Sequence, residues 1–249
     1  MSVKDVRTHI MLDLEIAAHP LEHNPAIIQI GAIHFDIETG ENLKYFSMHI
    51  NLESCIEFGL ITDSDTLQWL EKNIPNTLSA SQNSKVALDV ALERFTTWLS
   101  SCHKSTKANI NSKYPTAKYD PTDLQIMIWA FGSPQDCRWM ESAYKACELK
   151  KPWMHYNDLC VRTYCETAFS ITGRNIRRDV DKSFVGKKHN AIDDCKHQII
   201  YVIKCRDALR GEQASAISPV AAAPLPAPDS SRKRPRTVLD DNRSRMGLE

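Results

Sequence analysis

The sequence predicts an α/β domain followed by a tail of different composition. Short apolar runs rich in β-branched residues alternate along the chain with longer segments that carry apolar residues at helical spacing. Hydrophobic residues make up 42% of the chain, which is enough for a substantial core. After Gly211 the composition changes to Ala and Pro and then to charged residues, so we expect residues 211–249 to be disordered.

Five segments are predicted to be strands. Residues 8–14 form a dense Ile, Met and Leu run, and residues 25–35 form a second apolar run. A turn signal at Thr39-Gly40 follows, and residues 43–50 alternate, so these last two segments are expected to form a hairpin beside the first strand. Two further strands are predicted, a buried one at residues 124–131 and a short one at residues 153–156.

Helices are expected wherever apolar residues recur at helical spacing after a capping residue. The predicted helices are residues 63–72, capped by Asp63 or Ser64, residues 85–99, residues 135–149, a segment from Asn157 or Asp158 to Phe169, and residues 191–210. The polar segment 103–123 is predicted to be a long loop, and the basic segment 173–188 is predicted to be a connector.

Charge and cysteine usage narrow the class of protein. The formal net charge is zero, which argues against a purely electrostatic, histone-like binder of nucleic acid. The eight cysteines include no C-x-x-C pair, so we expect core thiols in a reducing compartment. The first ten residues lack a signal-like apolar segment, and no apolar run approaches the roughly 18 residues of a membrane helix. We therefore expect a cytoplasmic protein with no membrane partner.

The first candidate site is Asp13-Leu14-Glu15 at the end of the first predicted strand. Residues i and i+2 of a strand share a face, so both carboxylates are expected on one side while Leu12 and Leu14 point into the core. Two acids on one strand face form half of a cage for a hard cation. The alternative is an ordinary solvated strand face.

Two other segments carry acidic residues at comparable positions. Asp136 follows a buried strand and a glycine, although a carboxylate in the first turn of a helix is also explained by capping. His189 precedes a helix that Asn190 is expected to cap, and Asp194 lies in its first turn. Carboxylates from three segments raise one another's pKa unless cations compensate them. The combination predicts a two-metal phosphodiesterase site with a histidine base.

Two neighbours of this third segment are expected to serve other purposes. Asp193 points away from Asp194 by helical geometry and is predicted to be solvated. His197 lies on the same helix and is predicted to be a surface or packing residue.

The pattern D-x-E, then D, then H-x-x-x-x-D resembles the three motifs of the DEDDh (DnaQ-like) 3′→5′ exonucleases. Within this family, residues 8–210 more closely resemble the phage exonuclease A and bacterial RNase AS type. The stretches that carry this resemblance are MLDLE, IIQIGAIHFDIETG, DSDTLQWL, NDLCVRT and GKKHNAIDDCKHQ. The resemblance implies a ribonuclease H-like fold, with a mixed five-stranded sheet flanked by helices, in an exonuclease domain at residues 1–210. It also implies a bacterial or phage-infected cell, and a homodimer by analogy with relatives.

The resemblance assigns a role to each of the five matched residues. Two Mg²⁺ or Mn²⁺ ions, about 4 Å apart, would be held by four carboxylates, with Asp13 as the bridging ligand, and His189 would act as the general base. The four carboxylates belong to Asp13, Glu15, Asp136 and Asp194. The expected substrate is single-stranded DNA or RNA with a free 3′ end, and the choice between them stays open.

The chain departs from the family pattern in two places. Ile16 stands where Thr or Ser usually follows the second acid, and Gly132 to Gln135 replaces a segment that usually carries Asn and Phe. Contacts to the terminal nucleotide are therefore expected to differ at these positions, while the metal ligand Asp136 is retained.

Substrate contacts are expected from aromatic and basic side chains. Trp69 and Phe131 are candidates for stacking on a base, with core packing as the alternative. Arg178 and Lys188, in a connector that also carries Arg174, Arg177, Lys182 and Lys187, are candidates for phosphate contacts, with a solvated basic loop as the alternative.

Two other functions remain compatible with the sequence. One is a non-catalytic nucleic-acid- or protein-binding module on the same fold, and the other is a phosphodiesterase of dinucleotides or short oligonucleotides. The basic run at residues 232–236 is predicted to be a nucleic-acid tether or an import signal, with a solvated end as the alternative.

Overall fold

The computed structural model of the protein describes residues 7–113 and 125–215. Five strands form one open sheet in the order β3-β2-β1-β4-β5. The strands are β1 (Thr8–Ile16), β2 (Ile27–Phe35), β3 (Asn42–His49), β4 (Ile126–Ala130) and β5 (Asp158–Cys160). The β1–β2 and β2–β3 pairs are antiparallel, whereas the β1–β4 and β4–β5 pairs are parallel. The prediction of a mixed five-stranded sheet with a hairpin beside the first strand is confirmed.

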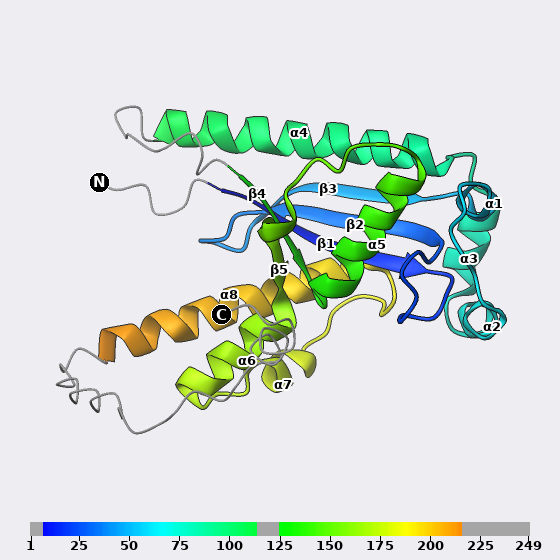
Figure 1. Ribbon diagram of the computed structural model, residues 1–249. Coiled ribbons are helices and arrows are strands. Elements are labelled where there is room, and N and C mark those ends of the chain that lie inside the picture. The colour runs from blue at the N-terminus through cyan, green and yellow to red at the C-terminus, as the bar shows by residue number, and fades with distance from the viewer. Residues whose placement is uncertain (1–6, 114–124, 216–249) are drawn as a thin grey trace, which may run out of the picture. The chain divides into compact units, whose positions relative to one another are not determined.

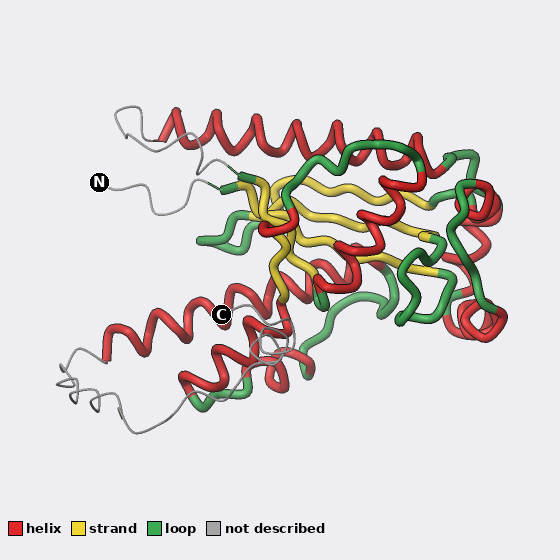
Figure 2. Tube along the Cα trace, in the orientation of Figure 1, coloured by secondary structure: helices red, strands yellow, loops and turns green. Residues whose placement is uncertain are grey.

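Helices cover both faces of this sheet (Figures 1 and 2). In chain order they are α1 (Leu52–Glu57), α2 (Ser64–Asn73), α3 (Pro75–Gln82), α4 (Leu88–Lys113), α5 (Ser133–Ala146), α6 (Val161–Thr172), α7 (Ile176–Asp181) and α8 (Ala191–Ser215). Helices α4 and α5 lie on one side of the sheet, and α6, α7 and α8 lie on the other.

Strand β1 divides its side chains between two cores. Leu12 and Leu14 are buried with Phe95 of α4 and Met140 of α5. Met11, on the opposite face, is buried with residues of α6 and α8. This alternation fixes Asp13 and Glu15 on the α8 side of the sheet, as the i, i+2 spacing predicts.

The predicted loop at residues 103–123 is wrong in its first half, because α4 continues to Lys113. The segment up to Lys113 contains no proline, and Ile110 is buried. Its polar residues also bind the sheet: His103 hydrogen-bonds the Thr8 hydroxyl at 3.0 Å, and Thr106 Oγ1 lies 3.1 Å from His34 Nε2. Long-range packing therefore extends a helix through a segment that reads as polar. The remainder of the predicted loop, from residue 114, lies outside the described residues.

The predicted short strand at residues 153–156 is also wrong, because β5 begins at Asp158 and a 3₁₀ turn at His155–Asn157 precedes it. Trp153 leaves the sheet to pack edge-on against Phe95, and its Nε1 donates to Asp158 Oδ1 at 2.7 Å. The following helix, α6, starts after Cys160, so neither Asn157 nor Asp158 caps it.

Three short helices, α1, α3 and α7, are absent from the sequence prediction, and α7 interrupts the predicted basic connector. The helix at residues 63–72 is confirmed as α2, and the Asp63 side chain caps it by accepting from Thr66 N at 2.7 Å. All eight cysteines are free, and most are buried. Helix α8 continues to Ser215, and the rest of the predicted tail lies outside the described residues. In the ranges described, no helix is long and apolar enough to cross a membrane.

Candidate active site

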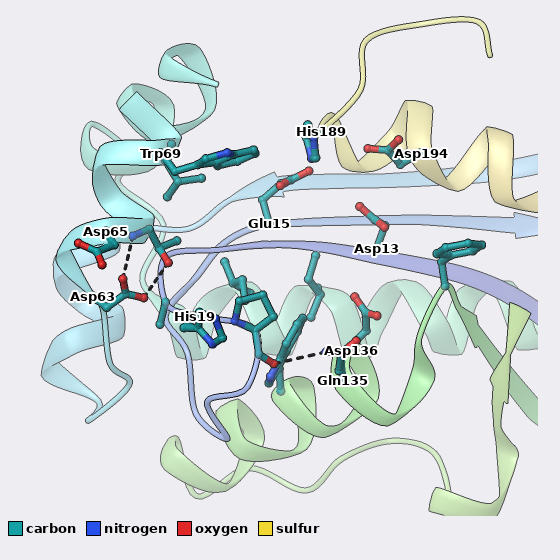
Figure 3. A pocket seen from close by; sticks show the side chains of 18 of the residues that line it. Asp13, Glu15, His19, Asp63, Asp65, Trp69, Gln135, Asp136, His189 and Asp194 are labelled. Carbon is teal, nitrogen blue, oxygen red and sulfur yellow. Dashed lines mark hydrogen bonds between the residues drawn. The ribbon is translucent and has the colours of Figure 1, made fainter. Parts of the chain in front are cut away.

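Three of the predicted acidic residues converge where β1 meets the beginning of α8. Asp13, Glu15 and Asp194 each offer a carboxylate oxygen, and these three oxygens lie within 4.8 Å of one another. Figure 3 shows Glu15, Asp194 and His189 gathered on one side of β1, with Asp13 beside them and Asp136 approaching from α5. All five predicted residues line a single cleft of about 880 Å³.

A glycine brings α8 this close to the strands. Gly31 of β2 is paired with Asp13 of β1, and a Cβ built on Gly31 would lie 2.5 Å from the Ala191 Cβ. Real Cβ atoms do not approach so closely, so only glycine allows the first turn of α8 to rest on β2. That contact places Asp194 over the strand face that carries Asp13 and Glu15.

His189 is held at the entrance to α8 in an uncommon backbone conformation. Its φ angle is 59°, in the left-handed region that histidine enters more readily than bulky or branched residues. Asn190 then caps the helix by accepting from Asp193 N at 3.2 Å. The His189 ring contacts Trp69 edge-on with 5.0 Å between centroids. The turn therefore directs the imidazole toward the acidic group.

The carboxylates repel one another and are poorly hydrated. Burial, followed by the charges of Asp194 and Asp136, raises the pKa of Glu15 from its ordinary 4.5 to about 8. Burial raises the pKa of Asp136 to about 7, although two backbone hydrogen bonds and the charge of Arg162 oppose this rise. The pKa of Asp13 is also raised well above its ordinary value, first by burial and then by its three acidic neighbours.

The donor set fits hard divalent cations. Several carboxylates share a partly buried space that would otherwise favour their neutral forms, and cations would restore their charges. The clustered ligand atoms are all carboxylate oxygens, the donors that Mg²⁺ and Mn²⁺ prefer.

Asp136 lies beside this group but is not one of the three closely spaced carboxylates. It occupies the first turn of α5, just after Gly132, whose φ of 138° suits glycine. Figure 3 shows the Asp136 carboxylate below Asp13, on the opposite side from Asp194. Its charge nevertheless raises the pKa of both Asp13 and Glu15, so it belongs to the same electrostatic unit.

Sequence reasoning missed several polar residues of the cleft, and two of them, Gln198 and Arg162, bear on its chemistry. Gln198 is buried, and its Nε2 donates to Asp13 Oδ1 at 2.8 Å. Its signal was its spacing, because it lies four residues after Asp194 on the same face of α8. Arg162 of α6 also lines the cleft. Its signal was its segment, because Arg162 lies in NDLCVRT, one of the stretches on which the family resemblance rests.

The predicted substrate-binding residues do not all line the cleft. Trp69 is 43% exposed, and it lines the cleft together with Phe131. Within the part of the chain that the structure describes, the lining does not include Arg178 or Lys188. Arg178 is exposed on α7, and Lys188 Nζ lies 5.9 Å from the Phe184 ring centroid.

Asp193 and His197 are both outside the cleft lining, but Asp193 is bonded within the chain and is not the solvated side chain that was predicted. Asp193 accepts from Lys187 N at 3.0 Å and from Lys196 Nζ at 2.9 Å, which ties the preceding loop to α8. His197 is buried, with its ring 4.7 Å from Phe184 and 4.8 Å from Tyr201 between centroids. It is therefore a packing residue.

Comparison with known proteins gives one family and several structures of the same fold. The model of the Rv2179c-like family, described as a 3′-5′ exoribonuclease Rv2179c-like domain, matches residues 8–205. No curated protein matches the sequence significantly.

Among solved structures, a 3′-exonuclease described in specific recognition of the 3′ end of the histone mRNA stem-loop aligns at 13% identity. Its TM-score is 0.54, with 82% of each chain covered. Cell-death related nuclease 4 aligns at 15% identity with a TM-score of 0.52, over 83% of this chain and 66% of its own. The nuclease domain of 3′hExo, a DEDDh family member bound to rAMP, aligns at 14% identity with a TM-score of 0.50, over 85% and 96%. At these identities the likeness concerns the fold, and it agrees with the predicted ribonuclease H-like architecture.

Proposed function

Because the chain belongs to the 3′-5′ exoribonuclease Rv2179c-like domain family and is thus a 3′-5′ exonuclease, we propose that it removes nucleotides from the 3′ end of single-stranded RNA. The observation that carries the proposal is the convergence of Asp13, Glu15 and Asp194 within 4.8 Å, in a cleft that also contains Asp136 and His189. The family's description as exoribonucleases favours RNA over DNA. Family membership also argues against the non-catalytic alternative.

We propose that two divalent cations, Mg²⁺ or Mn²⁺, are held by Asp13, Glu15, Asp136 and Asp194. When bound, they would neutralise charge on the scissile phosphate and stabilise the leaving oxygen. The acidic side chains also define where the phosphate must lie. Without cations these carboxylates would repel it, so substrate and metal binding should be coupled.

His189 is proposed to accept the proton of the attacking water on an imidazole nitrogen. Its exposed ring lines the cleft, and Trp69 contacts it edge-on at 5.0 Å, which restricts its rotation. A base positioned on the rim can receive a proton from the cleft and release it to solvent. The contact with Trp69 leaves the exposed remainder of the indole ring as a stacking surface for a terminal base.

The experiment uses the purified full chain with 5′-labelled single strands of RNA and DNA that share one sequence. We expect RNA products that shorten stepwise from the 3′ end in the presence of Mn²⁺ or Mg²⁺, with none in EDTA. Asp194→Asn should abolish this ladder. The matched control is Asp207→Asn, an exposed acid on the same helix that pairs with Arg206, and it should retain full activity.

Three results would contradict parts of the proposal. Equal rates on DNA would remove the preference for RNA. Cleavage of dinucleotides but not of longer strands would favour the alternative of a short-oligonucleotide phosphodiesterase. Unchanged hydrolysis by Asp194→Asn would exclude the proposed metal site.

A further inference from the structure

Two arginines from different helices share one aromatic ring beside the cleft. Phe131 follows the last residue of β4, and its ring centroid lies 4.8 Å from Arg162 Cζ and 4.9 Å from Arg177 Cζ. Arg162 belongs to α6 and Arg177 to α7, and both are exposed. Their guanidinium carbons cannot be farther apart than the sum of these two distances. We call Arg162 and Arg177 the arginine pair.

Among the described residues, neither arginine of the pair forms a salt bridge, although the charge of Arg162 acts on Asp136 in the cleft. Asp181, on the same short helix as Arg177, accepts instead from the Tyr201 hydroxyl and lies 3.7 Å from His197 Nε2. Asp179, also on α7, pairs with Lys182 at 3.4 Å. The nearby carboxylates of α7 are thus engaged elsewhere, and the positive charge of the pair is available for an anion from outside the chain.

Gly132, the residue after Phe131, lies at ordinary contact distance from Arg162. A Cβ on Gly132 would lie 3.6 Å from Arg162 Cζ and 3.0 Å from Gln135 Oε1, and its φ of 138° already disfavours any other residue.

We propose that the arginine pair binds successive backbone phosphates of the RNA strand whose 3′ nucleotide occupies the acidic cleft. This inference rests on the proposed function. Arg162 lines the same cleft as the four carboxylates, so a strand leaving the acidic centre past it would meet a cation next. Guanidinium groups bind phosphate through paired N–H donors, and the cation–π contacts with Phe131 restrain the positions of both groups. Because the chain has no net charge, a local cationic path is what would bring a polyanion to an acidic centre.

A different role for Arg162 makes a distinct prediction. The charge of Arg162 opposes the rise in the pKa of Asp136. If the role of Arg162 is to keep Asp136 ionised, then Arg162 acts on metal binding. In that case its removal would shift the Mn²⁺ concentration needed for half-maximal activity. A phosphate-binding role would leave that concentration unchanged and alter the affinity for RNA.

The test compares Arg162→Ala, Arg177→Ala and Arg162→Lys in the full chain, with Arg138→Ala as the control. Arg138 is an exposed arginine on α5 that does not line the cleft. The probe is a fluorescent RNA 12-mer, measured by steady-state hydrolysis with Mn²⁺ and by anisotropy with Asp194→Asn added to each variant to prevent cleavage. Thermal unfolding verifies that each variant is folded.

We expect each alanine variant to raise the KM and the dissociation constant by roughly tenfold at low salt, with little change in kcat. The slope of log affinity against log salt should fall by about 0.7 for each phosphate that the variant no longer binds. Replacing one backbone phosphate by neutral methylphosphonate near the 3′ end should weaken binding of the parent protein but not of the matching alanine variant. Arg162→Lys should retain the salt slope and lose part of the affinity.

The outcomes separate this inference from the proposed function. If the unsubstituted protein hydrolyses RNA but the folded alanine variants bind it with unchanged affinity and salt slope, the arginine pair is not a phosphate site. A shift in Mn²⁺ dependence without a change in affinity would also overturn it, in favour of compensation of Asp136. Failure of the unsubstituted protein to hydrolyse RNA would instead contradict the proposed function.

Discussion

Neutralising Glu15 should stabilise the metal-free protein, and the gain should depend on pH. Glu15 is 8% exposed, and burial with two acidic neighbours raises its pKa from 4.5 to about 8. Between these values the folded protein retains a proton that the unfolded chain releases. Its free energy of unfolding therefore falls as pH rises from 4.5 and levels off above about 8. Glu15→Gln removes this titration and keeps the shape of the side chain.

The size of the effect follows from the shift in pKa. Each unit corresponds to about 1.4 kcal/mol, so Glu15 alone destabilises the metal-free protein by at most about 3 kcal/mol at pH 7 and by little at pH 4.5. We expect Glu15→Gln to recover a substantial part of this amount at pH 7. With cations bound, the unsubstituted protein should be more stable than Glu15→Gln. Its ionised carboxylate would then hold a metal, and metal binding to the folded state adds to the free energy of unfolding.

The assay is urea denaturation from pH 5 to pH 8, in EDTA and in Mn²⁺. The control is Glu71→Gln, an exposed glutamate on α2 that should change stability by less than about 0.5 kcal/mol at every pH. A stability difference between Glu15→Gln and the unsubstituted protein that stays constant with pH would refute the electrostatic reasoning. A destabilised variant in EDTA at pH 8 would refute it as well.

Three further predictions concern the geometry of the site and the extent of the domain. His189→Ala should lower turnover by roughly 10²–10⁴-fold, and calorimetry should find its Mn²⁺ affinity unchanged. The control His155→Ala, at an exposed histidine, should stay fully active. A loss below threefold in His189→Ala would exclude His189 as the base. Gly31→Ala should cost about 1–3 kcal/mol in denaturation and reduce activity, because the new methyl group displaces Ala191 and the start of α8; a fully active, equally stable variant would contradict the close approach. Truncation after Ser215 should leave the melting temperature and the turnover unchanged. It should raise the KM for long strands at low salt only. Loss of folding would show that part of the core lies beyond residue 215.

Much of the fold and the acidic part of the site follow from local patterns in the sequence. A strand has a side-chain period of two, so the alternation in residues 8–16 already assigns Asp13 and Glu15 to one face and Leu12 and Leu14 to the other. The capping residues Asp63 and Asn190 likewise mark the starts of α2 and α8. These features depend on neighbours within a few residues, so no long-range contact is needed to infer them.

Other features were decided by contacts between distant segments. Helix α4 continues to Lys113 with Ile110 buried and Thr106 bonded to His34, none of which its polar composition reveals. Trp153 packs on α4 and α5 instead of extending the sheet, which moves the last strand to Asp158.

The site divides in the same way. Its acids and His189 could be predicted because their chemistry requires those residue types at those spacings. The Gln198 bond to Asp13 and the contacts of Arg162 and Arg177 with the Phe131 ring could not be predicted, because each joins segments far apart in the chain. Sequence alone predicted which carboxylates and which histidine meet in the cleft. Only tertiary packing decided that the Gln198 amide bonds Asp13 and that two arginine side chains lie beside the cleft, because burial and three-dimensional neighbours set those contacts.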